Sequence, residues 1–511
     1  VLDAMRRFYE DANANPLRGL YPLSIAATDA LEHARETAAR FLGAEHPEEI
    51  IFTRNTTEGL NLVAYSYALS HLQSGDEVLV SIMEHHSNLL PWQLVCERIG
   101  AQLRFLEGEK DGSLDAEKAV QAVTPRTKLV ALTQLSNVLG AEYPVRAVAD
   151  AAHAVGAVMV VDGAQSTPHI PVDVKALGAD FFACSGHKLY GPMGIGILYG
   201  KRALLLAMPP FLRGGEMIDS VHRDGAVFAE LPHKFEAGTP DAASAAGLAA
   251  AIDFIEAIGF DAVREAEDVL CAYTLPRLAA IPGVHIVGSE DPAKHHGILT
   301  FTLDGVHPHD VSEILAADGV CVRAGHHCAQ PLHEHLGLRS TTRASFAFYN
   351  TKEDADRFYK VLKQSEGKWA MAINNFYNEI LTEHNLYPEC KCHMEHPTVE
   401  KDGVNPSCGD EIRLMLKTDG DRIEDGAFTG DGCAISQAST DIMLSMIKGK
   451  TRAQALHLAD LFTRMIHSEA SPQEIEELEE AGALSDIAHM PARVKCAMLP
   501  WRTLREALTE V

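Results

Sequence analysis

The run Ser185-Gly186-His187-Lys188-Leu189-Tyr190-Gly191-Pro192 decides the fold of this chain. It follows an apolar strand, Phe181–Cys184, and lies about one βα unit beyond a strand that ends at Asp162. Pyridoxal phosphate (PLP) needs a lysine that binds it covalently and a carboxylate that keeps its pyridine nitrogen protonated. The pairing of Lys188 with Asp162 therefore predicts a PLP enzyme that acts on an amino acid.

The composition of the chain excludes several classes of protein. The 511 residues include 46 % hydrophobic and 23 % charged residues, which is typical of a globular protein with more than one domain. The net charge of −27 argues against a nucleic-acid partner. The sequence contains no apolar run of about eighteen residues, the length that would predict a membrane-spanning helix. The ten cysteines are dispersed, which favours reduced thiols, metal ligands or nucleophiles in a cytoplasmic protein.

Short β-branched runs alternate with helical patterns in the first part of the chain. The expected strands are Ile50–Thr53, Glu77–Ser81, Leu129–Thr133, Val158–Asp162, Phe181–Cys184 and Gly196–Tyr199. This alternation predicts an α/β fold with a mostly parallel sheet covered by helices on both faces. Ligands of such sheets bind beyond the carboxyl ends of the strands, where Asp162 lies.

The pattern of expected strands and helices changes after the Ala-rich helix expected at Ala242–Ile258. A smaller α+β lobe is expected, with strands at Ile298–Thr302, Val320–Arg323 and Ala344–Phe348 and a helix at Lys352–Gln364. A polar hinge at Ser365–Lys368 precedes a second α+β unit with a hairpin at Asp419-Gly420. The predicted domains are therefore residues 1–365 and 371–511.

Two turns in the first domain carry groups suited to a cofactor. Arg54–Gly59 follows a strand and opens a helix, where the hydroxyls of Thr56 and Thr57 suit a phosphate. A capping box is the alternative for this segment, and the nearby lysine motif favours phosphate. His85 also follows a strand. An isolated histidine at such a position is most often a surface or capping residue. In a PLP enzyme, however, a histidine from this turn can stack on the pyridine ring and exchange protons.

The run Arg323–Pro331 supplies a nucleophile. Cys328 lies in a Gly-containing loop beside two histidines and near Arg323, and neighbouring positive charge favours the reactive thiolate. Three other thiols of this domain are expected to be buried small hydrophobes. They are Cys184, Cys271 and Cys321.

Together these segments closely resemble class II cysteine desulfurases of the SufS type, which are fold-type I PLP enzymes. The matching runs are Arg54–Gly59, Met83–Trp92, Ser136–Gly140, Val161–Gln165, Ser185–Pro192, Phe235–Pro240, Arg323–Pro331 and Arg343–Thr351, within residues 1–365. The resemblance implies a homodimer that converts L-cysteine to alanine and leaves a persulfide on Cys328. That sulfur would feed iron–sulfur cluster assembly through downstream scaffold proteins of the Suf type.

The resemblance also implies a role for each site residue. Lys188 would be the Schiff-base lysine, Asp162 would pair with the pyridine nitrogen, and Gln165 would bond the phenolate oxygen. His85 would stack on the ring and serve, with Lys188 and Cys328, in catalysis. The other implied cofactor ligands are Thr56, Thr57, Asn137, Ser185, His187 and, from the other subunit, Thr239. The implied substrate ligands are Asn137, Arg323 and Arg343, with Arg343 gripping the carboxylate as a bidentate fork.

The start of the chain departs from this family pattern. The chain begins at Val1, without an initiator Met, and lacks a Leu-Asp-Asn-Ala-Ala-Thr-like run that lines the family's substrate pocket. Leu17-Arg18-Gly19 stands where the family has His-Arg-Gly. We therefore expect that the first domain is truncated at its N-terminus.

A second set of chemical residues lies near the C-terminus. Cys408, Asp410, Cys433 and Cys496 each lie in or near a segment marked by Gly or Pro, and three cysteines with an aspartate could close a tetrahedral zinc site. Buried structural thiols are the alternative. Cys433 is expected to begin a helix, where the dipole favours a thiolate.

These motifs resemble SufU-type zinc-dependent sulfur acceptors, which are related to IscU scaffolds, over residues 371–511. The resemblance implies that Cys408, Asp410, Cys433 and Cys496 bind zinc and that Cys408 accepts sulfur. In desulfurases that use such acceptors, a histidine can exchange into the zinc shell. His309 is the matching candidate here, with a helix-cap histidine as the alternative.

Two other interpretations remain open from the sequence, and a third is disfavoured. A selenocysteine lyase would share the PLP site, and the C-terminal unit could instead be a scaffold that assembles a cluster. A PLP fold used only for binding is disfavoured, because the chemical positions are intact apart from the missing start. The run Cys390-Lys391-Cys392-His393 is interpreted as an unassigned loop rather than an accessory metal site.

Overall fold

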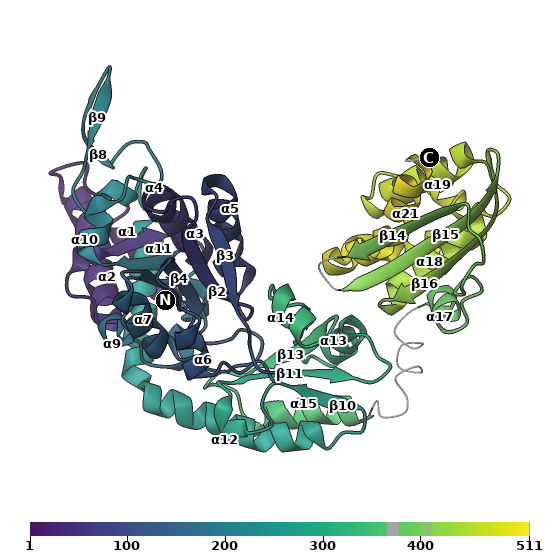
Figure 1. The fold of residues 1–511 in the computed structure, drawn as a ribbon, viewed down its shortest axis with the longest axis horizontal. Coiled ribbons are helices and arrows are strands. Elements are labelled where there is room, and N and C mark those ends of the chain that lie inside the picture. Colours follow the sequence, from purple (N-terminus) through teal and green to yellow (C-terminus); the bar gives the residue numbers. More distant parts are fainter. Residues whose placement is uncertain (365–377, 406–408, 510–511) are drawn as a thin grey trace.

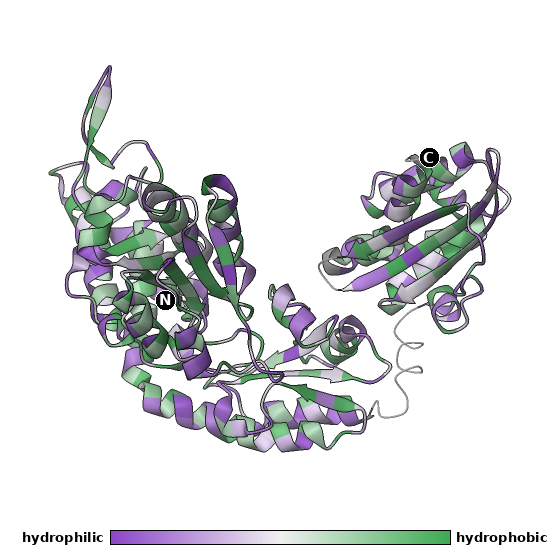
Figure 2. Cartoon of the chain, viewed as in Figure 1, coloured by the Kyte–Doolittle hydropathy of each residue, from purple (hydrophilic) through white to green (hydrophobic). Residues whose placement is uncertain are grey.

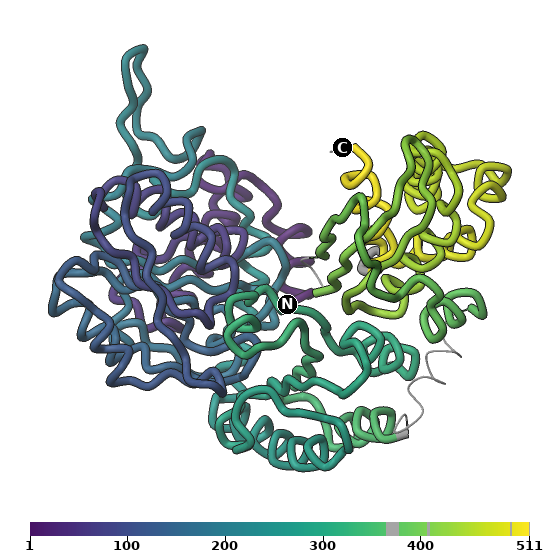
Figure 3. Tube along the Cα trace, turned by 45° about the vertical axis from the view of Figure 1, so that its right-hand side comes forward, coloured from purple at the N-terminus to yellow at the C-terminus, as the bar shows by residue number. Residues whose placement is uncertain are grey.

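The computed structural model describes residues 1–364, 378–405 and 409–509. Three bodies follow one another along the chain: a large α/β domain, a smaller α+β lobe and a C-terminal α+β unit (Figure 1). The view turned by 45° keeps the same three bodies, with the small lobe below the other two (Figure 3). The long helix α12 (Phe260–Ala279) leads from the large domain into the small lobe.

The large domain is built on a seven-stranded sheet with the order β1-β7-β6-β5-β4-β2-β3. The strands are β1 (Ile50–Thr53), β2 (Glu77–Ser81), β3 (Gln102–Leu106), β4 (Thr127–Thr133), β5 (Val158–Asp162), β6 (Phe181–Ser185) and β7 (Gly196–Gly200). The strands from β6 through β3 are mutually parallel, and β7 runs antiparallel to both β6 and β1. The predicted mostly parallel sheet is confirmed.

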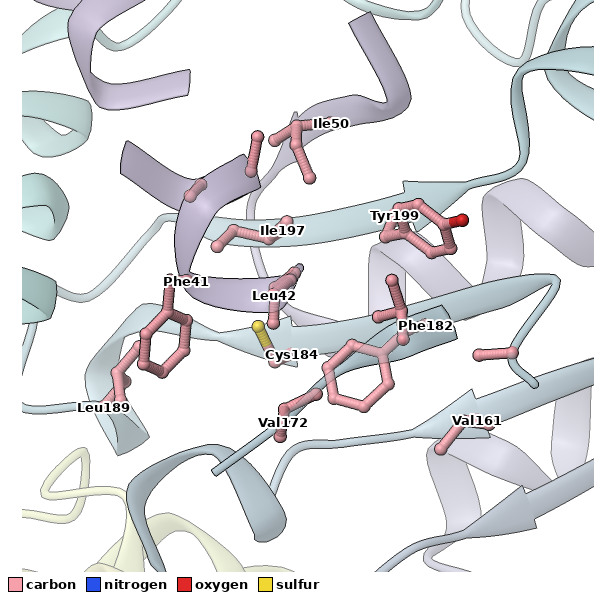
Figure 4. Packing of buried hydrophobic residues seen from close by; sticks show 14 of the residues in the cluster. Phe41, Leu42, Ile50, Val161, Val172, Phe182, Cys184, Leu189, Ile197 and Tyr199 are labelled. Carbon is pink, nitrogen blue, oxygen red and sulfur yellow. The ribbon is translucent and has the colours of Figure 1, made fainter. Parts of the chain in front are cut away.

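Helices cover both faces of this sheet, as its fully buried strands require. Side chains of β5 alternate between two cores, since Val161 joins one cluster and Val160 the other. On the first face, Leu42 of α2 (Pro22–Leu42) belongs to the same buried cluster as Phe182 of β6 (Figure 4). The other covering helices are α3 (Thr56–Leu62), α5 (Leu90–Ile99), α7 (Val145–Ala154) and α11 (Ala242–Ile258). The sheet strands are largely hydrophobic, whereas hydrophilic residues gather on the outer sides of the helices (Figure 2).

Shorter elements complete the large domain. They are α1 (Leu2–Asp11), the π-helical turn Val63–Ala68, α4 (Leu69–His71), α6 (Ala116–Gln121), α8 (Ser166–His169), α9 (Val174–Leu177), α10 (Arg202–Ala207) and the protruding hairpin β8–β9 (Ile218–His222, Gly225–Phe228). Within the described ranges, no helix taken singly combines the length and apolarity of a membrane span. Helices α11 and α12 meet that test only as a pair, bent by 73° where they join.

The small lobe has an antiparallel sheet of order β10-β11-β13-β12. Its elements are β10 (Val284–Val287), β11 (Ile298–Leu303), α13 (Pro308–Ala317), β12 (Arg323–Gly325), α14 (Gln330–His335), β13 (Thr341–Ser345) and α15 (Lys352–Gln364).

Two strand predictions in this lobe are wrong in their bounds. The strand expected at 320–323 begins only at Arg323, because the N–H of Val320 bonds the carbonyl of Leu315 and closes the end of α13. The strand expected at 344–348 instead spans Thr341–Ser345, because its polar first residues pair with β11 and β12.

The C-terminal unit packs helices on a three-stranded antiparallel sheet of order β14-β15-β16. Its elements are α17 (Glu379–Leu386), β14 (Val399–Asn405), β15 (Asp410–Asp419), β16 (Arg422–Asp431), α18 (Ala434–Ile447), α19 (Arg452–Ile466), α20 (Pro472–Glu476), the 3₁₀ segment η7 (Glu479–His489) and α21 (Pro491–Thr509). The hairpin expected at Asp419-Gly420 joins β15 to β16, and Gly420 supplies the positive φ of 57°. Phe462 of α19 stacks on Trp501 of α21 in the core of the unit.

Candidate active site and metal centre

A cavity of about 280 Å³ lies at the carboxyl ends of the central strands. Its lining includes Asp162, the last residue of β5, and Ser185, the last residue of β6. Lys188 follows in the 3₁₀ turn η4 (Gly186–Lys188) and also faces the cavity. The predicted residues in the lining are Thr56, Thr57, His85, Asn137, Asp162, Gln165, Ser185, His187, Lys188, Arg323 and Arg343.

Asn55, rather than a threonine, caps helix α3 by accepting a backbone N–H of its first turn. The hydroxyls of Thr56 and Thr57 are therefore not used in a capping box. Thr56 Oγ1 lies 2.6 Å from Ser185 Oγ, and Thr57 Oγ1 lies 2.7 Å from Ser87 Oγ. All four residues line the cavity, and their hydroxyls are a donor set suited to a phosphate. The contribution of Ser87 was missed from the sequence, although the residue stands two positions after His85.

Asp162 and Lys188 provide opposite charges in the cavity. Asp162 is 3 % exposed and accepts the N–H of Ala164 at 2.9 Å. Burial raises its pKa, and the nearby Lys188 opposes that rise. Burial lowers the pKa of Lys188, against the attraction of Asp162. A buried carboxylate, an amine and a cluster of hydroxyls fit the pyridine nitrogen, the aldehyde and the phosphate of PLP.

His85 is held as a neutral imidazole. The N–H of Ser87 donates to its Nδ1 at 3.1 Å, so the proton of the neutral ring is on Nε2. Burial lowers the pKa of His85 to about 3, with the charges of Lys188 and His86 adding to the effect. The ring can therefore present an N–H into the cavity at physiological pH.

Two further histidines form a chain of hydrogen bonds behind Cys328. His327 Nε2 lies 2.9 Å from Thr341 Oγ1, which lies 3.0 Å from His333 Nε2. His333 Nδ1 donates to the carbonyl of Ala329 at 3.0 Å, so its Nε2 accepts the threonine hydroxyl proton. Burial lowers the pKa of His327 to about 2 and that of His333 to about 4.

These low pKa values predict that mild acid destabilises the fold. His85, His327 and His333 titrate in the folded state well below their ordinary 6.5, so the unfolded chain binds more protons between pH 6.5 and about 4. The free energy of unfolding should therefore fall as pH drops through this window, by up to about 1.4 kcal/mol per pH unit for each histidine. Denaturant unfolding at pH 7 and pH 5 measures the fall. His333→Gln should reduce its slope, and an unchanged slope would contradict the assignment.

Arg323 and Arg343 lie on neighbouring strands, paired in register between β12 and β13. Arg343 donates through Nη1 to the carbonyl of Asn137 at 2.6 Å, while its buried Nε has no hydrogen-bond partner in the described part of the chain. Burial, and then the charge of Arg323, lower the pKa of Arg343 to about 10. Two guanidinium groups directed at one cavity suit the carboxylate of an amino acid.

Cys328 does not line the cavity itself but is held beside it. Its Sγ lies 3.6 Å from Nη2 of Arg323. His327 and Cys328 both adopt positive φ values, 53° and 59°. Their carbonyls accept hydrogen bonds at 2.7 Å from Asn137 Nδ2 and from the N–H of His86.

Thr239 lines a separate cavity of about 460 Å³ in its own chain and does not reach the PLP cavity. Its predicted role in the partner subunit's site stays a prediction. Cys184 and Cys271 are buried, as expected of small hydrophobes, but Cys321 is exposed. The prediction for Cys321 is wrong because the residue lies between the end of α13 and β12, outside the core.

Asp410, Cys433 and Cys496 form a buried group whose ligand atoms lie within 4.8 Å of one another. Asp410 begins β15, Cys433 is the N-cap of α18 and Cys496 lies in α21. Asp410 Oδ1 accepts the N–H of Cys433 at 3.0 Å. Burial and the adjacent Cys496 raise the pKa of Cys433 well above its ordinary value, contrary to the effect expected from the helix dipole alone.

Two thiols and a carboxylate fit zinc, whose charge would stabilise the thiolates. Cys408 lies outside the described residues.

His307 and His309 of the small lobe approach this centre from outside. His307 Nδ1 accepts the N–H of His309, and its Nε2 lies 3.2 Å from Asp410 Oδ1. Among the residues that the structure describes, His309 is not part of the three-residue group, and its buried Nε2 has no hydrogen-bond partner. Burial lowers the pKa of His309 to about 3, which leaves a neutral ring.

The loop at Cys390 is anchored by protein groups. Asp441 Oδ1 accepts the N–H of Cys390 at 2.7 Å, and Asp441 Oδ2 lies 2.7 Å from His384 Nδ1. Across the described ranges, neither Cys390 nor Cys392 joins a group that could hold a metal ion. Residues 390–393 lie in a loop, and the absence of a metal role for them stays a prediction.

Comparisons with known proteins match both parts of the chain. Residues 1–358 match the family described as aminotransferase class-V, and residues 376–508 match the NifU-like N-terminal domain. A probable cysteine desulfurase of Halalkalibacterium halodurans is 50 % identical over 366 residues, which are 72 % of this chain and 89 % of that protein. An apo cysteine desulfurase structure from Thermococcus onnurineus NA1 is 41 % identical with a TM-score of 0.69, over 72 % of this chain and 91 % of that one. The cysteine desulfurase CsdA from Escherichia coli, in its S-sulfonic acid form, is 40 % identical with a TM-score of 0.66, over 71 % of this chain and 90 % of that one.

These matches agree with the arrangement of the cavity, in which a lysine, a buried carboxylate and clustered hydroxyls fit PLP. The NifU-like match agrees with a separate unit that carries its own buried cysteines and aspartate. The chain therefore belongs to the class-V aminotransferase family, as a PLP-dependent cysteine desulfurase joined to a NifU-like domain of iron–sulfur assembly.

Proposed function

We propose that this chain removes sulfur from L-cysteine as a persulfide on Cys328 and passes it to its own zinc-binding C-terminal unit. The sulfur then goes to iron–sulfur cluster assembly in the cytoplasm. The observation that carries this proposal is the position of Cys328, whose Sγ lies 3.6 Å from a guanidinium that also lines the PLP cavity. The working domains are proposed to be residues 1–365 and 371–511.

The substrate is held by its carboxylate. Arg343 would form the bidentate contact, and the adjacent Arg323 adds positive charge on the side of Cys328. Asn137 fixes this arrangement, since its carbonyl oxygen accepts from Arg343 and its side chain holds the loop at His327. The Cβ–Sγ bond of cysteine is thereby directed toward the nucleophile.

Lys188 is the proposed base that removes the proton from Cα. Burial lowers its pKa and so increases the fraction of neutral amine. PLP, which Lys188 would hold until the amine of L-cysteine takes its place, would supply an electron sink for this chemistry, and Asp162 is placed to keep its pyridine nitrogen protonated. Thr56, Thr57 and Ser185 would hold the phosphate.

Cys328 then attacks the substrate sulfur. A new S–S bond forms, the Cβ–Sγ bond breaks, and the carbon fragment takes protons at Cβ and Cα to become L-alanine. The thiol of Cys328 and one L-cysteine thus give one persulfide and one L-alanine, with no external oxidant. His85, which carries a proton on Nε2, is the proposed proton carrier near Sγ.

The sulfur leaves by thiol–persulfide exchange with Cys408. The Cys408 thiolate attacks the outer sulfur, and Cys328 departs as a thiolate. Zinc held by Cys408, Asp410, Cys433 and Cys496 would restrain the acceptor until it is needed. His309 is the proposed replacement ligand, supported by its buried Nε2, which has no hydrogen-bond partner within the described ranges.

The proposal is tested by following sulfur from ³⁵S-labelled L-cysteine in the wild-type chain and in Cys408→Ala. We expect label on C-terminal peptides of the wild type under non-reducing conditions and its loss from those peptides in the variant. Alanine formation should persist in both when a strong thiol reductant accepts sulfur from Cys328. Labelling of the C-terminal unit that does not depend on Cys408 would refute the relay.

Zinc binding gives a separate prediction. Cys433→Ser should remove most of the bound zinc and lower the melting temperature of the C-terminal unit, because a buried ligand is lost from a site that couples to folding. Elemental analysis and calorimetry measure both effects. Cys390→Ser is the matched control, since this thiol lies in the same unit outside the metal group. Equal zinc content in all three proteins would place the metal elsewhere.

Cluster assembly on the C-terminal unit is the second candidate function, and the NifU-like match favours it. Anaerobic reconstitution with iron and cysteine distinguishes the two. A stable cluster that displaces zinc supports a scaffold, whereas retained zinc with labelled Cys408 supports a sulfur acceptor.

Two chains are proposed to form the active enzyme. Thr239 lies outside the PLP cavity of its own chain, in a cavity lined partly by the apolar side chains of Phe52, Phe211 and Phe235. A second copy could place Thr239 at the phosphate of its partner. Light scattering gives the mass in solution, and a monomer with full activity would exclude this arrangement.

A further inference from the structure

Helix α13 of the small lobe meets the two cysteine-bearing helices of the C-terminal unit. In Figure 1, α13 lies on the side of the lobe that faces β16 and α18. Ala434 of α18 belongs to the same buried apolar cluster as Leu315 of α13. The contact between the two units is therefore a packed junction that includes the metal centre.

Asp310, in the first turn of α13, uses its two carboxylate oxygens for two different partners across this junction. Oδ1 accepts from Arg493 Nη2 at 2.7 Å, and Oδ2 accepts the N–H of Ala434 at 3.0 Å. The side chains of Asp310 and Arg493 are only 4 % and 3 % exposed. A charge pair buried to this degree is weakly screened, and removing one member leaves the other without compensation.

The two partners of Asp310 adjoin the metal ligands. Ala434 directly follows Cys433 at the start of α18, and Arg493 lies one helical turn before Cys496 in α21. One carboxylate of the desulfurase lobe therefore holds both helices that carry the cysteines. Glu313, one turn further along α13, reinforces this contact through Arg493 Nε at 2.5 Å.

The backbone beside Asp410 also approaches the lobe closely. A Cβ atom added to Gly409 would lie 2.6 Å from the carbonyl oxygen of Arg339 and 3.3 Å from His326 Nε2. The close approach places the residue after Cys408 against the segment that leads into β13. The junction thus brings the C-terminal unit to the side of the lobe that carries the Cys328 loop.

We infer that Asp310 is a positioning residue for sulfur transfer within one chain: it holds α18 and α21, and hence the metal centre, against the desulfurase lobe. The inference rests on the proposed relay for its functional consequence, while the docking itself rests on the contacts alone. Both carboxylate oxygens act as acceptors, and an asparagine of the same shape can offer only one. Asp310→Asn should therefore weaken docking without changing packing volume.

The test compares the full-length wild type with Asp310→Asn and with Arg339→Gln. Arg339 pairs with Asp431 at 2.9 Å across the same junction, but the two side chains are 53 % and 75 % exposed. A solvent-exposed pair contributes little, so Arg339→Gln is the matched control. We expect Asp310→Asn to slow the appearance of ³⁵S on C-terminal peptides by about 10- to 100-fold, and Arg339→Gln to slow it less than about threefold.

Two further measurements separate positioning from simple loss of structure. Alanine formation with a strong thiol reductant, which bypasses the C-terminal unit, should be unchanged in Asp310→Asn, as should its zinc content. Hydrogen exchange at the start of α18 should become faster, since the Ala434 N–H loses its acceptor. Wild-type sulfur transfer, loss of zinc, or unchanged exchange in Asp310→Asn would each overturn the inference.

The exchange measurement also distinguishes the two proposals from each other. If the wild type places no label on C-terminal peptides, the sulfur relay fails. Faster exchange in Asp310→Asn would then still establish Asp310 as the residue that docks the C-terminal unit. Unchanged exchange in the same variant would reject the docking role as well.

Discussion

Lys188→Ala is expected to abolish the formation of alanine from L-cysteine in a chain that remains folded. The amine lies in the lining of the cavity, and it is proposed to supply both the covalent link to PLP and the base at Cα. Loss of a positioned base alone costs about 10²- to 10⁴-fold in rate. Loss of the covalent link to PLP reduces the rate further. The rate of alanine formation over time measures the combined effect.

The charge and the basicity of Lys188 can be separated. Lys188→Arg keeps a positive charge near Asp162 but cannot act as a base, so it should be as inactive as the alanine variant. Small primary amines added to Lys188→Ala should restore part of the proton transfer. Lys201→Ala, which removes an exposed lysine paired with Asp180, is the control for nonspecific effects. Substantial activity in Lys188→Arg would show that another group removes the proton.

Cys328→Ala is expected to lose the persulfide and to reduce alanine formation by several orders of magnitude, as enzymes do when they lose a covalent nucleophile. The substrate should still bind, because Arg343 and Asn137 do not depend on the thiol for their contact. The cofactor spectrum should therefore still respond to added L-cysteine. Mass spectrometry of the intact chain detects the added sulfur atom in the wild type alone.

Cys321→Ala is the matched control for this experiment. Cys321 is more exposed than Cys328 and lies close to it in the sequence. Its substitution should leave both persulfide and alanine unchanged. A persulfide that persists in Cys328→Ala and disappears in Cys321→Ala would reassign the nucleophile.

Buried strands were predictable because burial on both faces leaves a continuous apolar run. Glu77–Ser81 and Val158–Asp162 match the sequence expectation in full. The edge strand β3 was missed, since Gln102 and Arg104 interrupt its apolar residues and its surface is largely exposed. Edge strands carry a weaker hydropathy signal because only one neighbour and part of one face cover them.

The PLP cavity was largely predictable because each of its residues stands in a recognisable motif at a strand end. The junction was not predictable, since Asp310 and Arg493 are separated by most of the second half of the chain. Their contact depends on how two folded units pack, which no local pattern encodes. The contact of His307 with Asp410 has the same origin, whereas the resemblance named only His309, as the candidate for exchange into the zinc shell.

The loop of His327 and Cys328 links the chemistry to the arrangement of the lobes. Left-handed conformations of L-residues cost about 1–2 kcal/mol each, and here two occur in succession. The carbonyls that secure them are held by Asn137 and His86, which belong to the large domain. The loop itself belongs to the small lobe. The backbone conformation of the nucleophile therefore depends on contacts from both the large domain and the small lobe. A β-branched side chain fits a left-handed backbone poorly, so threonine could not replace Cys328 without disturbing the conformation of this loop.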